Sequence, residues 1–336
     1  GLRRQPWCVC HHATGAPARK WLRDGRSECR KHPEAPGRNG CVMTVTAAFM
    51  SAPLQAPPTT PQRENHNSGG SVPSLLKWTG SKRSQAMRIA AYAPAYQRYY
   101  EPFVGGGALL YLMAKPGSVA ADLYAPLTAF WTMVRDRPEQ LIKNYTEQWQ
   151  LLQKDLPGYF YIVRDRFNQT CQPEDLNFLM RTCVNGIVRF NKNGEFNNSF
   201  HLSRKGMLPA RFASIVRAWA PRLQGIEIRQ GDFEETLADA KKGDFVYLDP
   251  PYGGNKQRYI NDLDLTRVYA TLEDLNHRGI RWALSFAGMR GVKTYDHTIP
   301  TSIYRRKVLL DSGYSAISKV LNGPIEVVKE SLYLNY

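Results

Sequence analysis

An acidic residue, two prolines and a tyrosine directly follow a short apolar run, and this order constrains the fold more than any other feature of the chain. Residues 245–248 read Phe-Val-Tyr-Leu, and Asp249, Pro250, Pro251 and Tyr252 come next. An apolar run of this length that ends in a turn signal predicts a buried strand. Open α/β sheets bind their ligands at the carboxyl ends of their strands, where the Asp249 carboxylate is expected. The sequence therefore predicts an α/β fold with a polar site at the end of this strand.

The four residues of this motif combine a carboxylate, a free carbonyl and an aromatic ring. Proline has no N–H donor, so its carbonyl is available to accept a bond from another group. Such a set suits a planar group that carries an NH₂. A turn that only closes the strand, with Tyr252 in the packing, would use the same residues, so the motif alone leaves both interpretations open.

A second predicted strand, residues 98–103, runs into three glycines at 105–107. Glycines let the backbone adopt positive φ and approach a bound cofactor closely. Asp122 ends the next predicted strand, residues 118–121, about twenty residues later, which is the spacing of an acidic residue that binds ribose hydroxyls. Asp122 is also a residue type that caps helices. Asp232, which precedes Phe233, is a further strand-end candidate that would contact an adenine ring.

The remaining pattern predicts one sheet that is interrupted by a helical insertion. Further strands are expected at residues 226–229, 282–285 and 325–334, and residues 130–220 are mostly helical in pattern. An Asn- and Gly-rich stretch at 185–199 interrupts these helices. A helical insertion inside an α/β domain is the simplest account.

The first seventy residues differ from the rest in composition. Residues 1–42 contain nine basic and three acidic residues, and residues 51–73 are rich in proline and glycine, as linkers are. We expect a disordered extension over residues 1–70. A zinc module is the alternative, although the spacing of its candidate ligands is irregular; these are Cys8, Cys10, His11, His12, Cys29, His32 and Cys41.

The charge balance favours a polyanionic partner. The chain has 45 Lys and Arg against 29 Asp and Glu, a net charge of +16. Such an excess is typical of proteins that bind nucleic acid. Between residues 181 and 217 there is a single acidic residue, Glu195, among seven basic ones: Arg181, Arg189, Lys192, Arg204, Lys205, Arg211 and Arg217. Apolar runs are too short for a transmembrane helix, so no membrane association is expected.

The order of these motifs resembles the Dam-type DNA adenine-N6 methyltransferases. The resemblance runs over about residues 75–336 and begins with Lys77-Trp78-Thr79-Gly80-Ser81-Lys82, followed by Glu101-Pro102-Phe103-Val104 and the glycine turn, then Asp122 and the Asp249 motif. Residues 185–197 are similar to the family's DNA-recognition hairpin, and residues 330–336 to its last strand.

The resemblance implies a methyltransferase-type, Rossmann-like α/β fold with a mostly parallel sheet and an inserted helical DNA-recognition domain. We expect an N-terminal extension and linker over residues 1–70, the methyltransferase domain over 71–129 and 209–336, and the recognition insertion over 130–208.

The resemblance also implies S-adenosylmethionine as the cofactor and N6 of adenine in double-stranded DNA as the methyl acceptor. Family enzymes flip the target base out of the duplex. On this basis Asp249 and the Pro250 carbonyl accept hydrogen bonds from the amino group, and Tyr252 stacks on the base. The expected cofactor-binding residues are Trp78, Lys82, Phe103, Gly105, Gly107, Asp122, Asp232, Phe233 and Asp249. No metal is expected.

The expected DNA-binding residues are Asn185, Arg189, Asn191, Lys192, Asn197, Arg204 and Lys205, with Arg189 as the base reader. Ser199 and Leu202 stand where GATC-methylating relatives carry Pro and Arg, and Val184 replaces a common aromatic, so the resemblance does not assign a recognition sequence.

Two other functions compete with adenine methylation. N4-cytosine methylation uses the same amine chemistry, although Asp249 favours adenine, and a nucleic-acid-binding protein without catalysis would retain the basic residues. We expect a cytoplasmic protein of bacterial or phage origin, a monomer or weak dimer, with a restriction endonuclease as a candidate partner.

Overall fold

The computed structural model describes residues 72–203, 205–251, 263–290, 293–294, 299–314 and 327–336. The chain divides into two units, and all of the described residues belong to one of them. The other unit, residues 12–70, lies outside the described residues, and so do the cysteine and histidine cluster of the predicted extension, Arg204 and Tyr252.

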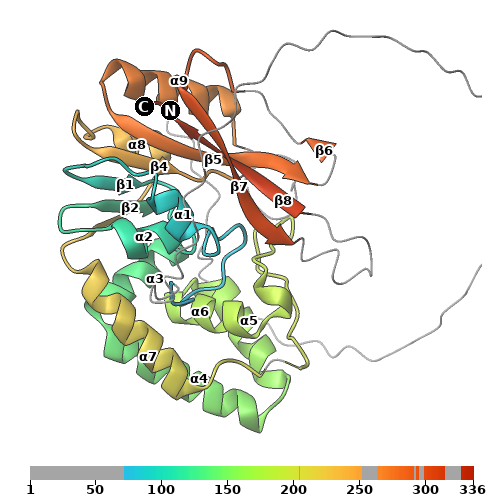
Figure 1. The fold of residues 1–336 in the computed structure, drawn as a ribbon. Helices are drawn as coiled ribbons and strands as arrows, with labels where there is room; N and C mark the ends of the chain where they lie inside the picture. Colours follow the sequence, from blue (N-terminus) through green and yellow to red (C-terminus); the bar gives the residue numbers. More distant parts are fainter. Residues whose placement is uncertain (1–71, 204, 252–262, 291–292, 295–298, 315–326) are drawn as a thin grey trace, which may run out of the picture. The chain divides into compact units, whose positions relative to one another are not determined.

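The described strands form one sheet in the order β3-β2-β1-β4-β5-β8-β7, with the short β6 paired to β5 (Figure 1). Neighbours from β3 to β5 run parallel, whereas β8 is antiparallel to both β5 and β7. The strands are β1 Tyr99–Glu101, β2 Val119–Asp122, β3 Glu227–Gln230, β4 Phe245–Leu248, β5 Arg281–Arg290, β6 Lys293–Thr294, β7 Arg306–Tyr314 and β8 Val327–Leu334.

The predicted α/β class with a mostly parallel sheet is confirmed. Each of the strands expected at 98–103, 118–121, 226–229, 245–248, 282–285 and 325–334 corresponds to an observed strand, β1 to β5 and β8. The pattern did not predict β6 and β7. The chain leaves β1 toward β2 on one side, while β4 pairs with β1 on the other, so the strand order reverses between β1 and β4. Open sheets bind ligands at the carboxyl edge of such a reversal.

Alternating side chains of the strands face two apolar layers. In β4, Phe245 and Tyr247 belong to one buried cluster and Val246 and Leu248 to the other, because successive residues of a strand point to opposite faces. Helices α1 Ala86–Ala90, α2 Ala108–Met113 and α3 Ala125–Asp136 contribute to the first cluster. Helices α8 Phe233–Leu237 and α9 Leu265–His277 contribute to the second, so helices cover both faces of the sheet.

The helical insertion lies between β2 and β3. Its helices are α4 Pro138–Lys154, α5 Gly158–Thr170, α6 Pro173–Thr182 and α7 Pro209–Trp219, with short 3₁₀ turns at Val184–Gly186 and Ala220–Leu223. α4, α6 and α7 each begin with proline, which lacks the N–H that a first helical turn leaves unbonded. α6 packs against α3, α4 and α5, and α7 packs against α4. The domain boundary expected at residue 208 stays a prediction.

The segment before α1 is held against the insertion by buried polar contacts. The guanidinium of Arg181, in α6, donates to the carbonyl oxygens of Ser74 and Leu75. The Trp219 indole N–H donates to the Pro73 carbonyl at 2.9 Å. These contacts fix residues 73–75 on the insertion, and residues 77–82 continue from there to the carboxyl edge of the sheet.

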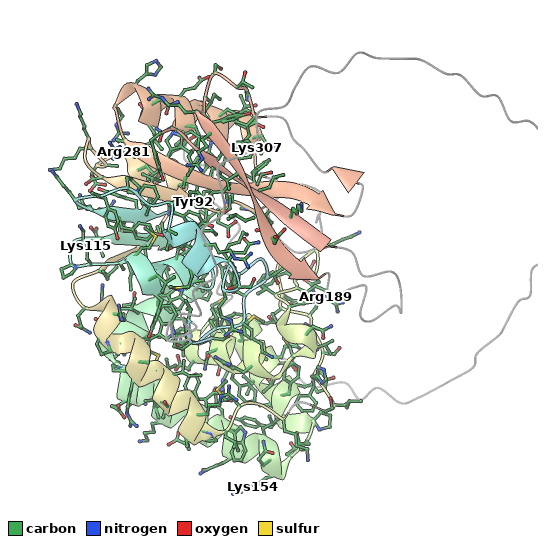
Figure 2. The ribbon with its side chains drawn as sticks, viewed as in Figure 1. Tyr92, Lys115, Lys154, Arg189, Arg281 and Lys307 are labelled. Atoms are coloured by element: carbon green, nitrogen blue, oxygen red, sulfur yellow. The ribbon has the colours of Figure 1, made fainter. Side chains whose placement is uncertain are left out.

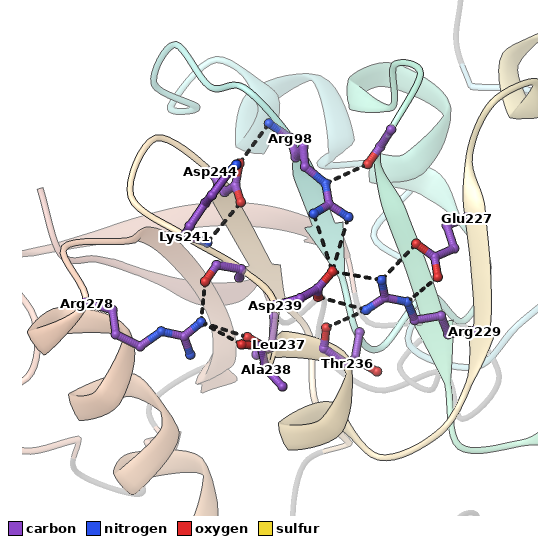
Figure 3. Close-up of polar contacts among 12 residues, drawn as sticks. Arg98, Glu227, Arg229, Thr236, Leu237, Ala238, Asp239, Lys241, Asp244 and Arg278 are labelled. Atoms are coloured by element: carbon purple, nitrogen blue, oxygen red, sulfur yellow. Dashed lines mark hydrogen bonds and ion pairs between the residues drawn. The ribbon is translucent and has the colours of Figure 1, made fainter.

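The opposite edge of the sheet is held by a charged network (Figure 3). Asp239 accepts from Arg229, on β3, at 2.9 and 3.0 Å and from Arg98, which precedes β1, at 3.4 Å. Arg229 also pairs with Glu227 at 2.7 Å, and the Arg98 backbone N–H donates to Asp244 before β4. The network ties the amino ends of β1, β3 and β4 together, so the carboxyl ends remain available for a site.

Gly107 offers a direct test of the packing beneath the glycine turn. Its φ is +67°, and a Cβ there would lie 2.9 Å from Trp131 and 3.1 Å from Trp219. Gly107→Ala should therefore lower the free energy of unfolding by about 2–4 kcal/mol, because the strained backbone and the overpacking costs add. Urea denaturation followed by circular dichroism measures the change.

Gly117→Ala is the matched control. Gly117 has a φ of +87° but has no atom within 4 Å of the added Cβ. This variant should lose only the backbone cost, about 1–2 kcal/mol. Equal losses in the two variants would contradict the clash with the indole rings.

Candidate functional site

The carboxyl ends of the central strands border a cavity of about 600 Å³. This volume lies within the range of small-molecule sites, roughly 300–1,000 Å³. All of the residues predicted to bind a cofactor line it: Trp78, Lys82, Phe103, Gly105, Gly107, Asp122, Asp232, Phe233 and Asp249. Pro250 lines it as well, whereas the predicted stacking residue Tyr252 lies outside the described residues. The structure thus brings together groups that are up to 172 residues apart in the chain, from Trp78 to Pro250.

The glycine turn packs against Trp78. Gly105 has a φ of +44°, and a Cβ there would lie 2.9 Å from Cδ1 of the Trp78 ring. The indole N–H of Trp131, in α3, donates to the Gly105 carbonyl at 3.1 Å. A side chain at residue 105 would therefore displace Trp78, so the wall of the cavity requires glycine at this position.

Asp122 ends β2 with its carboxylate next to this turn. Its oxygens accept the backbone N–H of Gly105 at 3.2 Å and that of Tyr124 at 3.1 Å. Burial nevertheless raises the pKa of Asp122 to about 6, and the backbone hydrogen bonds only partly offset it. A charged carboxylate at this edge is suited to accept hydrogen bonds from the hydroxyls of a ligand.

Asp249 ends β4 and is paired with Lys82. The Lys82 ammonium donates to Oδ1 at 2.7 Å, to Oδ2 at 2.9 Å and to the Gly80 carbonyl at 3.1 Å. Glu330, on β8, lies 3.7 Å from the same nitrogen. Burial lowers the pKa of Lys82, but the two carboxylates outweigh it, so the net shift is upward and the ammonium stays charged.

Asp232 and Phe233 form the far side of the cavity. Asp232 caps α8 by accepting the Glu234 N–H at 3.0 Å and pairs with Arg267 at 2.7 Å. The Phe233 ring packs on Phe103, with 5.3 Å between ring centroids. The Arg267 guanidinium carbon lies over the Phe233 ring, 5.0 Å from its centroid. The pair offers a carboxylate beside an aromatic surface, which suits a planar ring with an exocyclic amine.

The stretch that interrupts the helices forms the predicted hairpin. Phe190 and Phe196 pair antiparallel, and the backbone N–H of Asn197 donates to the Arg189 carbonyl at 3.0 Å. Across the hairpin the Arg189 guanidinium donates to the side-chain and backbone oxygens of Asn197. Asn191 closes the turn, since its Oδ1 accepts the N–H groups of Asn193 and Glu195. Asn197 and Asn191 thereby orient the hairpin and the Arg189 side chain.

Most of the predicted DNA-binding side chains that the structure describes are exposed. Asn185, Arg189, Lys192 and Lys205 lie on the surface, where Figure 2 shows Arg189. The prediction of Arg181 as part of this basic surface is wrong. Its side chain is only 5% exposed, because the guanidinium serves the carbonyls of residues 74 and 75.

Several residues that line the cavity were not predicted as site residues from the sequence, and four of them bring distant elements into its wall. Val188 and Phe190 line it from the hairpin, Tyr124 from the start of α3, and Glu330 from β8. The Tyr124 ring contacts both Trp78 and Phe190, with centroid separations of 6.2 and 5.6 Å. For Val188 and Phe190 the sequence does contain a signal. Apolar and charged residues alternate at 188–190, which predicts an extended segment whose apolar side chains point to one face and whose Arg189 points to the other.

The described residues, 72–203, 205–251, 263–290, 293–294, 299–314 and 327–336, contain neither a candidate metal cluster nor a candidate membrane span. Within these ranges there is no group of three or more His, Cys, Asp and Glu side chains arranged to hold a metal ion. In the same part of the chain, each helix is too short or too polar to cross a membrane.

One family model matches more than half of the chain. A model of the D12 class N6 adenine-specific DNA methyltransferases matches residues 78–306. A type II methyltransferase of Lactococcus lactis, M1.LlaDCHI, is 30% identical over 53% of this chain and 65% of its own length. The type II methyltransferase M.MjaIII of Methanocaldococcus jannaschii is 31% identical over 64% and 84%, respectively.

The retron Ec67 DNA adenine methylase of Escherichia coli is 27% identical over 56% of this chain and 67% of its own length. The chain thus spans about two thirds of the length of several curated relatives that it matches. Among solved structures, an rRNA methyltransferase of Streptomyces viridochromogenes, AviRa, is 14% identical with a TM-score of 0.34, over 81% of this chain and 93% of that one.

Asp122 gives a test of the electrostatics of the cavity. Because its pKa rises on folding, the folded state binds more protons than the unfolded state between about pH 4 and pH 6, and the carboxylate destabilises the fold above that window. Asp122→Asn should therefore raise the free energy of unfolding of the ligand-free protein by about 3 kcal/mol at pH 8. The gain should vanish below about pH 4. Urea denaturation across this range measures it, and a gain that does not depend on pH would contradict the assignment.

Proposed function

The chain belongs to the D12 class of N6 adenine-specific DNA methyltransferases, and from this we propose that it transfers a methyl group from S-adenosylmethionine to N6 of adenine in double-stranded DNA. The observation that carries the proposal is that one cavity is lined by the glycine turn, by Asp122 and by Asp249-Pro250. These elements correspond to the two halves of such a reaction, a place for a nucleoside cofactor and an acceptor for an amino group.

The residues around the glycine turn fit the cofactor. Gly105 and Gly107 leave the backbone uncovered, Asp122 offers oxygens to ribose hydroxyls, and Phe233 with Asp232 offers a surface and an acceptor to the adenine ring. Trp78, Phe103 and Lys82 complete the wall. When bound, S-adenosylmethionine supplies an electrophilic methyl group.

The end of β4 fits the base. A duplex buries the exocyclic nitrogen in its stack, so the target adenine has to flip into the cavity. The Asp249 carboxylate and the Pro250 carbonyl accept hydrogen bonds from the amino group, which turns the nitrogen lone pair out of the ring system. The protein contributes position and electrostatics, and the methyl group passes directly to the nitrogen.

The hairpin and its flanks form the proposed DNA surface. Arg189 reads a base edge, and Asn197 holds the guanidinium in place through bonds of 2.9 and 3.0 Å. Arginine pairs with guanine in a bidentate manner in the major groove. Lys192, Lys205 and Arg204 contact phosphates. Asn185, in the 3₁₀ turn Val184–Gly186, and Asn191, at the turn of the hairpin, contribute further polar contacts.

We further propose a cytoplasmic protein of bacterial or phage origin, a monomer or weak dimer. A restriction endonuclease in the same system is the partner suggested by the two relatives named type II methyltransferases. N4-cytosine methylation remains the second candidate, because it needs the same carboxylate and carbonyl.

The activity is tested by mass spectrometry of nucleosides from unmethylated duplex DNA incubated with the protein and S-adenosylmethionine. Wild type should produce N6-methyladenine, whereas Asp249→Ala should produce none while retaining its phosphate-driven DNA affinity. N4-methylcytosine would move the target base and keep the site. Near-normal turnover by Asp249→Ala would rule out the proposed role of Asp249.

Arg189→Ala tests base reading. The variant should lose about 1–3 kcal/mol of discrimination at one base pair. Sequencing of the methylated positions measures the change in site preference. Lys192→Ala is the control, since loss of a phosphate contact should weaken binding to all sequences alike. An unchanged preference in Arg189→Ala would remove this residue from the recognition role.

A further inference from the structure

The Lys82 ammonium lies between two carboxylates that come from different parts of the sheet. Asp249 at the end of β4 holds it at 2.7 and 2.9 Å, and Glu330 on β8 approaches it to 3.7 Å. The three side chains are 5%, 18% and 21% exposed, respectively, so water screens them only weakly. Strand β5 lies between β4 and β8 in the sheet, so Asp249 and Glu330 come from strands that are not neighbours.

Burial favours the neutral form of three titratable groups near this cluster. It raises the pKa of Glu101, at the end of β1, well above its ordinary value, although the Tyr99 hydroxyl donates to it at 2.9 Å. Burial also raises the pKa of both Tyr99 and Tyr247 well above the ordinary value. Among the described residues, the ion pairs of the cluster are those of Lys82 with Asp249 and with Glu330.

The ion pair poses a problem for the proposed reaction. Both oxygens of Asp249 lie on the Lys82 ammonium, and a cation this close keeps a carboxylate ionised but makes it a weak proton acceptor. As the new N6–C bond forms and the methyl–sulfur bond breaks, N6 is left with a surplus proton. In the proposed reaction, the Asp249 carboxylate is the acceptor from which this proton then passes to water, so the hold of Lys82 on Asp249 would have to loosen at that moment.

We infer that Glu330 is a positioning residue of this reaction: its carboxylate takes over the Lys82 ammonium when an Asp249 oxygen turns to the amino group of the target adenine. The inference rests on the proposed function. Lys82 keeps its three protons and its charge throughout, and only its partner changes. Without Glu330, the ammonium loses one of the two carboxylates that the described residues place beside it, so the pull on Lys82 away from Asp249 is weaker.

The inference is tested with Glu330→Gln in single-turnover methylation at saturating S-adenosylmethionine and DNA. The rate should fall about tenfold, while the affinities for cofactor and DNA stay within about twofold. Loss of a negative neighbour favours the ionised form of Asp249 and the neutral form of Lys82, so both limbs of the pH–rate profile should move to lower pH by about half a unit or more. Glu330→Asp should restore part of the rate and the original pH limbs.

Asp311→Asn is the matched control. Asp311 is exposed on β7 and lies opposite Lys329 of β8 in the strand register. The substitution removes one negative charge at a residue that does not contact Lys82. It should leave the rate and the profile unchanged. If Glu330→Gln fails to fold, Glu330→Asp decides alone, and pH limbs that move in this charge-conserving variant would overturn the inference.

The outcomes separate the two proposals. A wild-type protein that makes no methylated base fails the proposed function. An active wild type with a Glu330→Gln variant of equal rate and unchanged pH limbs leaves the function standing and overturns the role of Glu330. Loss of cofactor affinity in Glu330→Gln would also overturn it, since Glu330 would then act in the cofactor site.

Discussion

The buried ammonium of Lys82 is the interaction on which the arrangement of the cavity depends. A charge that is 5% exposed is costly unless it is paired, and its partners lie at the end of β4 and on β8. The loop at residues 77–82 must therefore stay close to the sheet edge, and the antiparallel β8 must lie next to β5. Trp78 is carried with this loop onto Gly105, so one ion pair also fixes the position of the glycine turn's outer wall.

The parallel part of the fold could be predicted from the sequence because each central strand carries its own signal. β4 is an apolar run that ends in Asp249, and β1 and β2 end at the glycine turn and at Asp122. β7 carries no such signal. Its residues 306–314 mix basic, apolar and small side chains, and among the described strands it lies at the edge of the sheet and pairs with β8 alone. Its existence depends on that partner, which a local pattern does not contain.

The candidate site divides in the same way. Residues at strand ends were predictable, because a strand followed by an acidic residue indicates position and chemistry together. Glu330 and Arg181 were not, since their roles depend on tertiary neighbours. Arg181 has the composition of a DNA-binding surface around it, yet α6 turns it inward to two backbone carbonyls. Charge along a chain predicts a basic segment without telling which of its members reach solvent.

Residues 188–190, on the first arm of the hairpin, limit how the proposed specificity can change among relatives. Val188 and Phe190 line the cavity, while Arg189 between them is exposed. The segment is therefore not an independent cassette. A hairpin transplanted from a relative would bring two wall residues of the cavity with it, so under the proposed role of Arg189 a change in base reading would be coupled to a change in the shape of the cavity. A change of specificity by exchange of the hairpin is therefore limited. Residues 188 and 190 must still fit the cavity, and residue 189 must at the same time read the new base.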